Sequence, residues 1–86
     1  MKYKLKEHVT DEMLIECGFI IRNQPYYRFA DKNYEKDYEN SLYISLSENY
    51  KAEPYREVSW NAIDKIDDIT PYIKDLINLG YVEVVE

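Results

Sequence analysis

Carboxylate and amide side chains recur at alternate positions in the stretch DKNYEKDYEN, residues 31–40. An EF-hand calcium loop also uses alternating oxygen ligands, but it requires glycine at its sixth position and glutamate at its twelfth. Counted from Asp31, these positions are Lys36 and Leu42, so both requirements fail. We therefore expect no metal site here. We interpret the stretch as a loop between strands that is either simply solvated or a contact loop for a protein partner. The contact residues of such a loop would be Tyr34, Glu35, Asp37, Tyr38 and Glu39.

A second acidic cluster, DKIDD, contains Asp64, Asp67 and Asp68. Carboxylates near a helix start complement the helix dipole, so capping is the favoured interpretation and a divalent-cation site the weaker one. Cys17 lies on the apolar face of an expected helix, where we expect it to behave as a small hydrophobic residue. His8 is the single histidine, so it cannot form an imidazole pair around a metal.

Nucleotide and catalytic motifs are missing from the sequence. It contains no GxSxG element, no P-loop and no dinucleotide fingerprint, and it has two glycines. One cysteine excludes an internal disulfide and any multi-cysteine zinc site. We expect no catalytic residue, no cofactor and no enzymatic activity.

The elements that would carry these side chains are short. Alternation in YKLKEHV predicts an edge strand or an extended arm, with Lys2, Lys4 and Lys6 protecting the edge. A helix is expected over 11–17, with Thr10 as N-cap and Gly18 after its end. Strands are expected over 19–23 and 26–30, joined near Pro25, and over 41–47, 55–60 and 81–85.

Near the end of the chain, Thr70 as N-cap and Pro71 in the first turn predict a helix to about Leu79, which Gly80 ends. The stretch 61–69 fits either a strand or a turn. This order of elements predicts an α+β fold in a single domain of 86 residues: a small, mainly antiparallel sheet with two short helices. The expected core is Leu5, Leu14, Phe19, Ile21, Phe29, Leu42, Ile44, Leu46, Trp60, Ile73, Leu76, Ile77, Val82 and Val84.

The charge of the chain limits its partners. The formal net charge is −6, divided into +1 over residues 1–30 and −7 over residues 31–86. Nucleic acids and anionic membranes attract basic proteins, so we expect neither as a partner. Ten tyrosines suit both half-buried strands and a protein interface, and the sequence leaves these two uses open. No apolar run is long enough to span a bilayer, and the N-terminus has no signal-peptide pattern, so we expect a cytoplasmic protein.

The two ends of the sequence carry a family resemblance. The start, MKYKLKEHVTDEMLIECGF, and the end, YIKDLINLGYVEVVE, resemble small uncharacterised phage and prophage proteins of Gram-positive bacteria. The resemblance covers less than half of the chain and implies a cytoplasmic, host-cell setting with no established activity.

Three functions are consistent with the sequence. The favoured one is a non-enzymatic accessory protein that binds a protein partner through an acidic, tyrosine-rich surface. The alternatives are a self-associating homodimer and an acidic DNA mimic that inhibits a nucleic-acid-binding protein.

Overall fold

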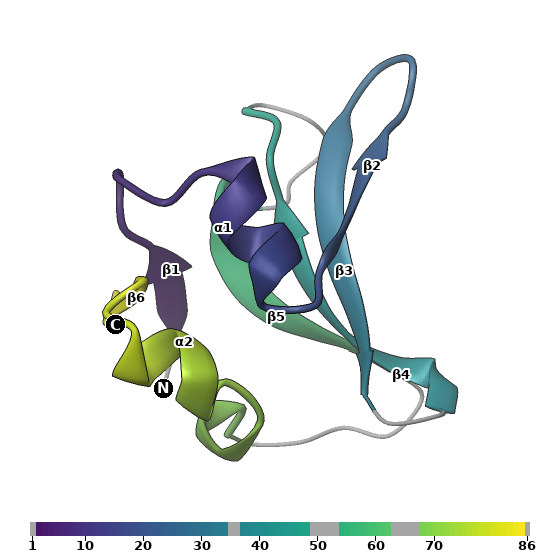
Figure 1. Cartoon of the computed structure of the whole chain (residues 1–86). Helices are drawn as coiled ribbons and strands as arrows, with labels where there is room; N and C mark the ends of the chain where they lie inside the picture. The colour runs from purple at the N-terminus through teal and green to yellow at the C-terminus, as the bar shows by residue number, and fades with distance from the viewer. Residues whose placement is uncertain (1, 35–36, 49–53, 63–67, 86) are drawn as a thin grey trace.

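The computed structural model in Figure 1 describes residues 2–34, 37–48, 54–62 and 68–85. The elements within these ranges are β1 (Tyr3–Leu5), α1 (Asp11–Glu16), β2 (Ile20–Asn23), β3 (Arg28–Tyr34), β4 (Asp37–Ser45), β5 (Glu57–Ala62), the 3-10 helix η1 (Thr70–Tyr72), α2 (Lys74–Asn78) and β6 (Val82–Val84). Across the described residues, six strands form a sheet in the order β2-β3-β4-β5-β1-β6, and neighbouring strands run antiparallel. This confirms the α+β class with an antiparallel sheet and two short helices.

Strand β1 lies inside the sheet. Tyr3 faces Val58 of β5 on one side and Val84 of β6 on the other. The prediction of an edge strand or a free arm is therefore wrong. The predicted alternation is confirmed, because Tyr3 and Leu5 are buried while Lys4 is exposed. Alternation determines which side chains point inward, but the pairing partners of β1 come from distant parts of the chain.

The core lies on one face of the sheet, where both helices pack (Figure 1). Helix α1 contributes the buried Leu14 and α2 contributes the buried Leu76. The sheet contributes residues at alternate positions of its inner strands, as a two-residue period requires. The buried hydrophobic residues are Tyr3, Leu5, Val9, Leu14, Phe19, Ala30, Leu42, Ile44, Val58, Ile69, Ile73, Leu76 and Val82.

Helix α1 begins and ends as its sequence predicts. The Thr10 hydroxyl accepts a hydrogen bond from the Met13 amide at 3.4 Å. The Thr10 amide in turn donates to the Met13 sulfur at 3.3 Å, which completes a capping box with methionine in the usual place of glutamate. Gly18 follows the helix with a φ of 95°, a left-handed conformation that glycine adopts readily.

The C-terminal helical region differs from the prediction of one continuous helix. Residues 70–72 form η1, Ile73 breaks the pattern with a φ of −125° and a ψ of 27°, and α2 follows. Thr70 is not an N-cap, because it is the first residue of η1 and Ile69 occupies the N-cap position. The amide of Thr70 donates to the carboxylate of Asp68 at 3.0 Å. The break allows Ile73 to be fully buried while Leu76 still faces the core. Gly80 ends the region with a φ of 75°, as predicted.

Three predicted core residues lie elsewhere. Phe29 is half-buried on the other face of the sheet, while Ile77 and Val84 are exposed. Val84 belongs to an outer strand of the sheet, so one of its sides meets solvent. Of the remaining predicted residues, Leu5, Leu14, Phe19, Leu42, Ile44, Ile73, Leu76 and Val82 are buried, and Ile21, Leu46 and Trp60 are partly buried against them.

Candidate functional site

The predicted contact residues belong to the hairpin formed by β3 and β4. Tyr34 ends β3 and its backbone pairs with Asp37, the first residue of β4. Tyr38 and Glu39 follow in β4, whereas Glu35 lies outside the described residues. Figure 1 shows that this end of the hairpin lies at the opposite end of β3 from the β2–β3 turn. The structure thus brings the four described contact residues to one end of the sheet.

The prediction of a loop over residues 31–40 is wrong, because most of this stretch is strand. It contains few apolar residues, so its two-residue alternation does not separate apolar from polar side chains. Successive residues of β3 nevertheless face opposite sides of the sheet. Asp31 pairs with Tyr43 on the outer side, and Lys32 pairs with the buried Leu42 on the core side. An extended β3 also differs from the tightly turned backbone of an EF-hand loop.

Aromatic rings support the base of the hairpin on the outer face of the sheet. The ring of Phe29 stacks between Tyr27, at a centroid distance of 5.4 Å, and Tyr43, at 5.0 Å. Beside them, Nε of Arg22 donates to a carboxylate oxygen of Asp31 at 2.9 Å. Cross-strand aromatic and charged pairs of this kind stabilise a sheet. The hairpin therefore extends from a supported base.

The tyrosines whose side chains the structure describes divide between the two uses that the sequence left open. Tyr3 is buried, Tyr27 and Tyr43 belong to the aromatic stack, and the ring of Tyr72 packs on Trp60 at 4.8 Å. These tyrosines pack within the fold. Tyr26, at the β2–β3 turn, is 87% exposed, which leaves its ring accessible to another molecule.

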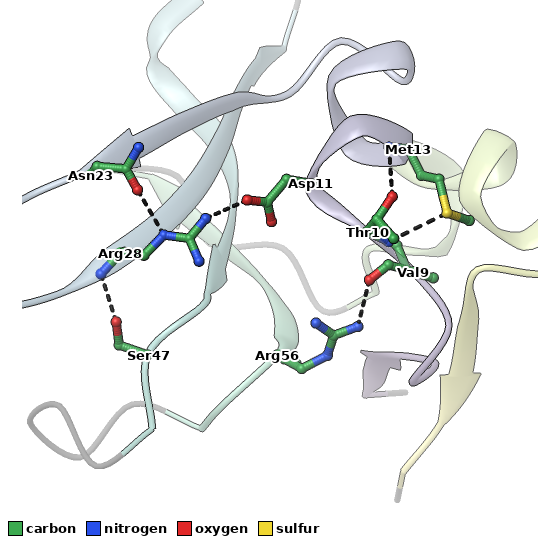
Figure 2. Close-up of polar contacts among 8 residues, drawn as sticks. All are labelled: Val9, Thr10, Asp11, Met13, Asn23, Arg28, Ser47 and Arg56. Carbon is green, nitrogen blue, oxygen red and sulfur yellow. Dashed lines mark hydrogen bonds and ion pairs between the residues drawn. The ribbon is translucent and has the colours of Figure 1, made fainter.

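Arg28 joins the hairpin to helix α1 (Figure 2). Its guanidinium donates through Nη2 to the carboxylate of Asp11 and through Nε to Asn23 Oδ1 at 2.7 Å. Its backbone amide donates to the Ser47 hydroxyl at 2.6 Å. The side chain of Arg28 therefore joins β3 to α1 and β2, and its backbone joins β3 to Ser47, which follows β4.

Arg56 holds the segment between β1 and α1. Its Nη2 donates to the carbonyl oxygens of Lys6 at 2.8 Å and Val9 at 3.1 Å, the second of which Figure 2 shows. Its backbone has a φ of 65°, a left-handed conformation that is uncommon for a residue with a side chain. Sequence reasoning missed this residue, because no local pattern marks a contact across 50 positions of sequence.

Cys17, Lys32 and Asp75 form a small cluster between the two helices. Nζ of Lys32 lies 3.4 Å from a carboxylate oxygen of Asp75, and it also lies 5.9 Å from the centre of the Phe19 ring. Burial is the main cause that raises the pKa of the Cys17 thiol, and the charge of Asp75 adds to this. A raised pKa keeps the thiol protonated, which disfavours a nucleophilic role.

The second acidic cluster is described only at Asp68. Its Oδ1 accepts from both the hydroxyl of Thr70, at 2.5 Å, and the amide of Thr70, at 3.0 Å. Both hydrogen bonds lower the pKa of Asp68, and the one from the hydroxyl has the larger effect. Asp68 therefore accepts hydrogen bonds from the first residue of η1, whereas Ile69 occupies the N-cap position. Asp64 and Asp67 lie outside the described residues, so capping by the whole cluster stays a prediction.

The described residues contain no cluster of metal-ligating side chains. Within residues 2–34, 37–48, 54–62 and 68–85, no three His, Cys, Asp or Glu side chains lie close enough together to hold a metal ion. His8 packs edge-on against the ring of Tyr81 at a centroid distance of 6.0 Å. No helix in the described part of the chain is both long and apolar enough to cross a membrane.

Comparison with known proteins returned no relative. No family model, no curated protein and no solved structure matches the chain. The resemblance to phage and prophage proteins stays a prediction.

Proposed function

We propose that the chain is a small non-catalytic accessory protein that binds a protein partner through the acidic end of the β3–β4 hairpin. The observation that supports this most is the position of Asp37 and Glu39 at alternate residues of β4. The pairing of β3 with β4 shifts its register here, from Asn33 opposite Ser41 to Tyr34 opposite Asp37. Glu35, two positions earlier in the sequence, extends the spacing of Asp37 and Glu39. We propose that these three carboxylates form an acidic row at the end of the hairpin.

The two tyrosines of the hairpin complement this row. Tyrosine supplies a rigid apolar ring with a polar tip, which is why it is enriched at protein interfaces. Tyr34 and Tyr38 would supply contact area, while the carboxylates would steer a basic partner and select it by charge. The formal net charge of −6 favours the same class of partner.

The setting we propose is the cytoplasm of a Gram-positive bacterium that carries a phage or prophage, in line with the resemblance of the two ends of the sequence. In this setting, basic proteins that bind nucleic acids are abundant partners for an acidic surface. An acidic inhibitor that mimics DNA is the second candidate function, and the charge of −7 over residues 31–86 favours it.

Affinity capture from a Gram-positive bacterial lysate, at low and high salt, tests the proposal. We expect a basic protein to be recovered at low salt and lost at high salt, because exposed charge pairs are screened. The variant E35Q/D37N/E39Q should recover less of it. The matched control E7Q/E12Q/E16Q changes the formal net charge equally, from −6 to −3, at exposed positions in and near α1.

The comparison of the two triple variants decides the outcome. Recovery that falls only in the hairpin variant supports the proposed surface. An equal loss in both variants would mean that net charge alone attracts the captured protein. Unchanged recovery in the hairpin variant would show that the partner binds another surface.

A further inference from the structure

Strand β6 is an outer strand of the sheet (Figure 1). The hydrogen bonds on its inner side determine which of its backbone groups point outward. The amide of Lys6 donates to the Tyr81 carbonyl at 2.8 Å, and the amide of Val85 donates to the Lys2 carbonyl at 3.0 Å. In an antiparallel pair the residues that face the neighbouring strand alternate with those that face away. The N–H and C=O groups of Val82 and Val84 therefore point away from β1.

The same edge is apolar. Val84 is 52% exposed and Val85 is 43% exposed, and Leu79, which lies between α2 and β6, is 54% exposed. Outer strands are commonly protected from pairing by lysine, proline or a bulge. Among the three residues of β6, the single charge is that of Glu83. Within the described residues no strand pairs with the outer side of β6. Backbone groups that point outward beside exposed valines favour the addition of another strand.

We propose that this edge pairs with the β6 edge of a second copy of the chain, antiparallel about a two-fold axis at Val84. In this arrangement the N–H of each Val84 donates to the C=O of the other Val84. The outward-pointing backbone groups of this residue are then hydrogen-bonded in both chains. A two-fold interface requires such a self-complementary patch. The two Val84 side chains, each half-exposed in the single chain, would then cover one another.

Charge determines the register. Pairing about Glu83 would place the two Glu83 residues directly opposite, at a Cα separation of about 4.5 Å, where like charges destabilise a sheet. Pairing about Val84 instead places Glu83 opposite Val85 of the second copy. The amide of Val85 donates to the carbonyl of Lys2, the residue that precedes β1. Lys2 of the second copy would then lie two strand spacings from Glu83, about 10 Å between Cα atoms, within reach of two long side chains.

The interface is small, so the dimer is weak. A three-residue strand buries much less than the roughly 1,200 Å² of a standard interface, and such contacts form transiently. We therefore expect association at protein concentrations of about 0.1 to 1 mM. A dimer would also present two β3–β4 hairpins at once, because β5 and β1 separate this hairpin from the β6 edge in the strand order.

Sedimentation equilibrium up to about 1 mM protein tests the proposal, with V84K as the first variant. Val84 is exposed, so V84K should leave the monomer folded, while two opposed lysines at the axis should weaken association at least about tenfold. The charge swap tests the register: K2E alone should weaken the dimer, and K2E/K4E/E83K should restore it, because K4E keeps opposite charges at positions 4 and 83, which face each other within each chain. The hairpin variant E35Q/D37N/E39Q should dimerise as the wild type does, so loss of partner binding and loss of dimerisation are separable.

Two results would overturn the inference. The first is a wild-type chain that stays monomeric over the whole concentration range. The second is a dimer that V84K leaves intact, because its interface then lies elsewhere. Failure of K2E/K4E/E83K to restore a dimer that K2E weakens would reject the Val84 register.

Discussion

Truncation of Arg56 should destabilise the fold although this residue lies outside the core. In R56A the carbonyl oxygens of Lys6 and Val9 lose the two hydrogen bonds from Nη2, at 2.8 and 3.1 Å. Hydrogen bonds to a charged group contribute about 1.5 to 3 kcal/mol each. The Lys6 carbonyl also accepts from the Val9 amide at 3.1 Å, so it keeps a partner in the variant. The expected loss is therefore about 2 kcal/mol, less than the roughly 3 to 6 kcal/mol of two full contributions.

The backbone of Arg56 supplies an internal control. At a φ of 65°, glycine avoids a steric cost of about 1 kcal/mol that alanine retains. R56G loses the same hydrogen bonds as R56A but should be more stable than R56A by about that amount.

Thermal unfolding followed by circular dichroism measures both variants. A loss of about 2 kcal/mol corresponds to a fall in Tm of about 8 to 16 °C for a chain of this size. R22A, which removes an exposed ion pair with Asp31, should change stability much less. If R56A unfolds at the wild-type midpoint, the hydrogen bonds of Arg56 do not hold the β1–α1 segment. If R56G is less stable than R56A, the argument from backbone strain is wrong.

Two further predictions concern the helix ends and pH. Both G18A and G80A should lose about 1 kcal/mol of folding stability from left-handed backbone strain. G18A should lose more, because its Cβ would lie 3.3 Å from Cε of Lys32, whereas space is open at Gly80. Thermal unfolding that ranks the two variants in the opposite order would reject this explanation. Because the pKa of Asp68 is lowered in the folded chain, the stabilisation from its charge is present above its unfolded pKa and is lost as pH falls through the folded value. The stability difference between wild type and D68N should therefore shrink between neutral pH and about pH 3, and a difference that does not change with pH would contradict the role of this carboxylate.

Local sequence signals predicted the elements whose structure depends on near neighbours. Thr10 and Gly18 delimit α1 because capping involves residues within one turn. The clean alternation of Leu42 and Ile44 with polar residues predicted the inner face of β4. These features require no knowledge of distant contacts.

Features that depend on long-range pairing were not predictable from the sequence. The position of β1 inside the sheet depends on β5 and β6, whose residues are more than 50 positions away. Lys32 appears in a polar stretch, yet its side chain crosses the core side of β3 to reach Asp75 on α2. Arg56 has no local signal either, since arginine is not a residue that favours positive φ.

For the candidate site, the structure bears on conformation alone. Spacing in the sequence predicted Asp37 and Glu39 as contact residues of a loop, and the structure assigns them to β4. The loop prediction was wrong because few residues of this stretch are apolar, so periodicity carries no apolar signal.

The most direct test of the proposed function is the affinity of the captured basic partner, once purified, for the two triple variants by titration calorimetry at low salt. We predict that E35Q/D37N/E39Q binds at least about tenfold more weakly than wild type, or about 1.4 kcal/mol, while E7Q/E12Q/E16Q, with the same net charge, binds nearly as wild type does. Equal affinity of the two variants for the partner would contradict the assignment of binding to the β3–β4 hairpin.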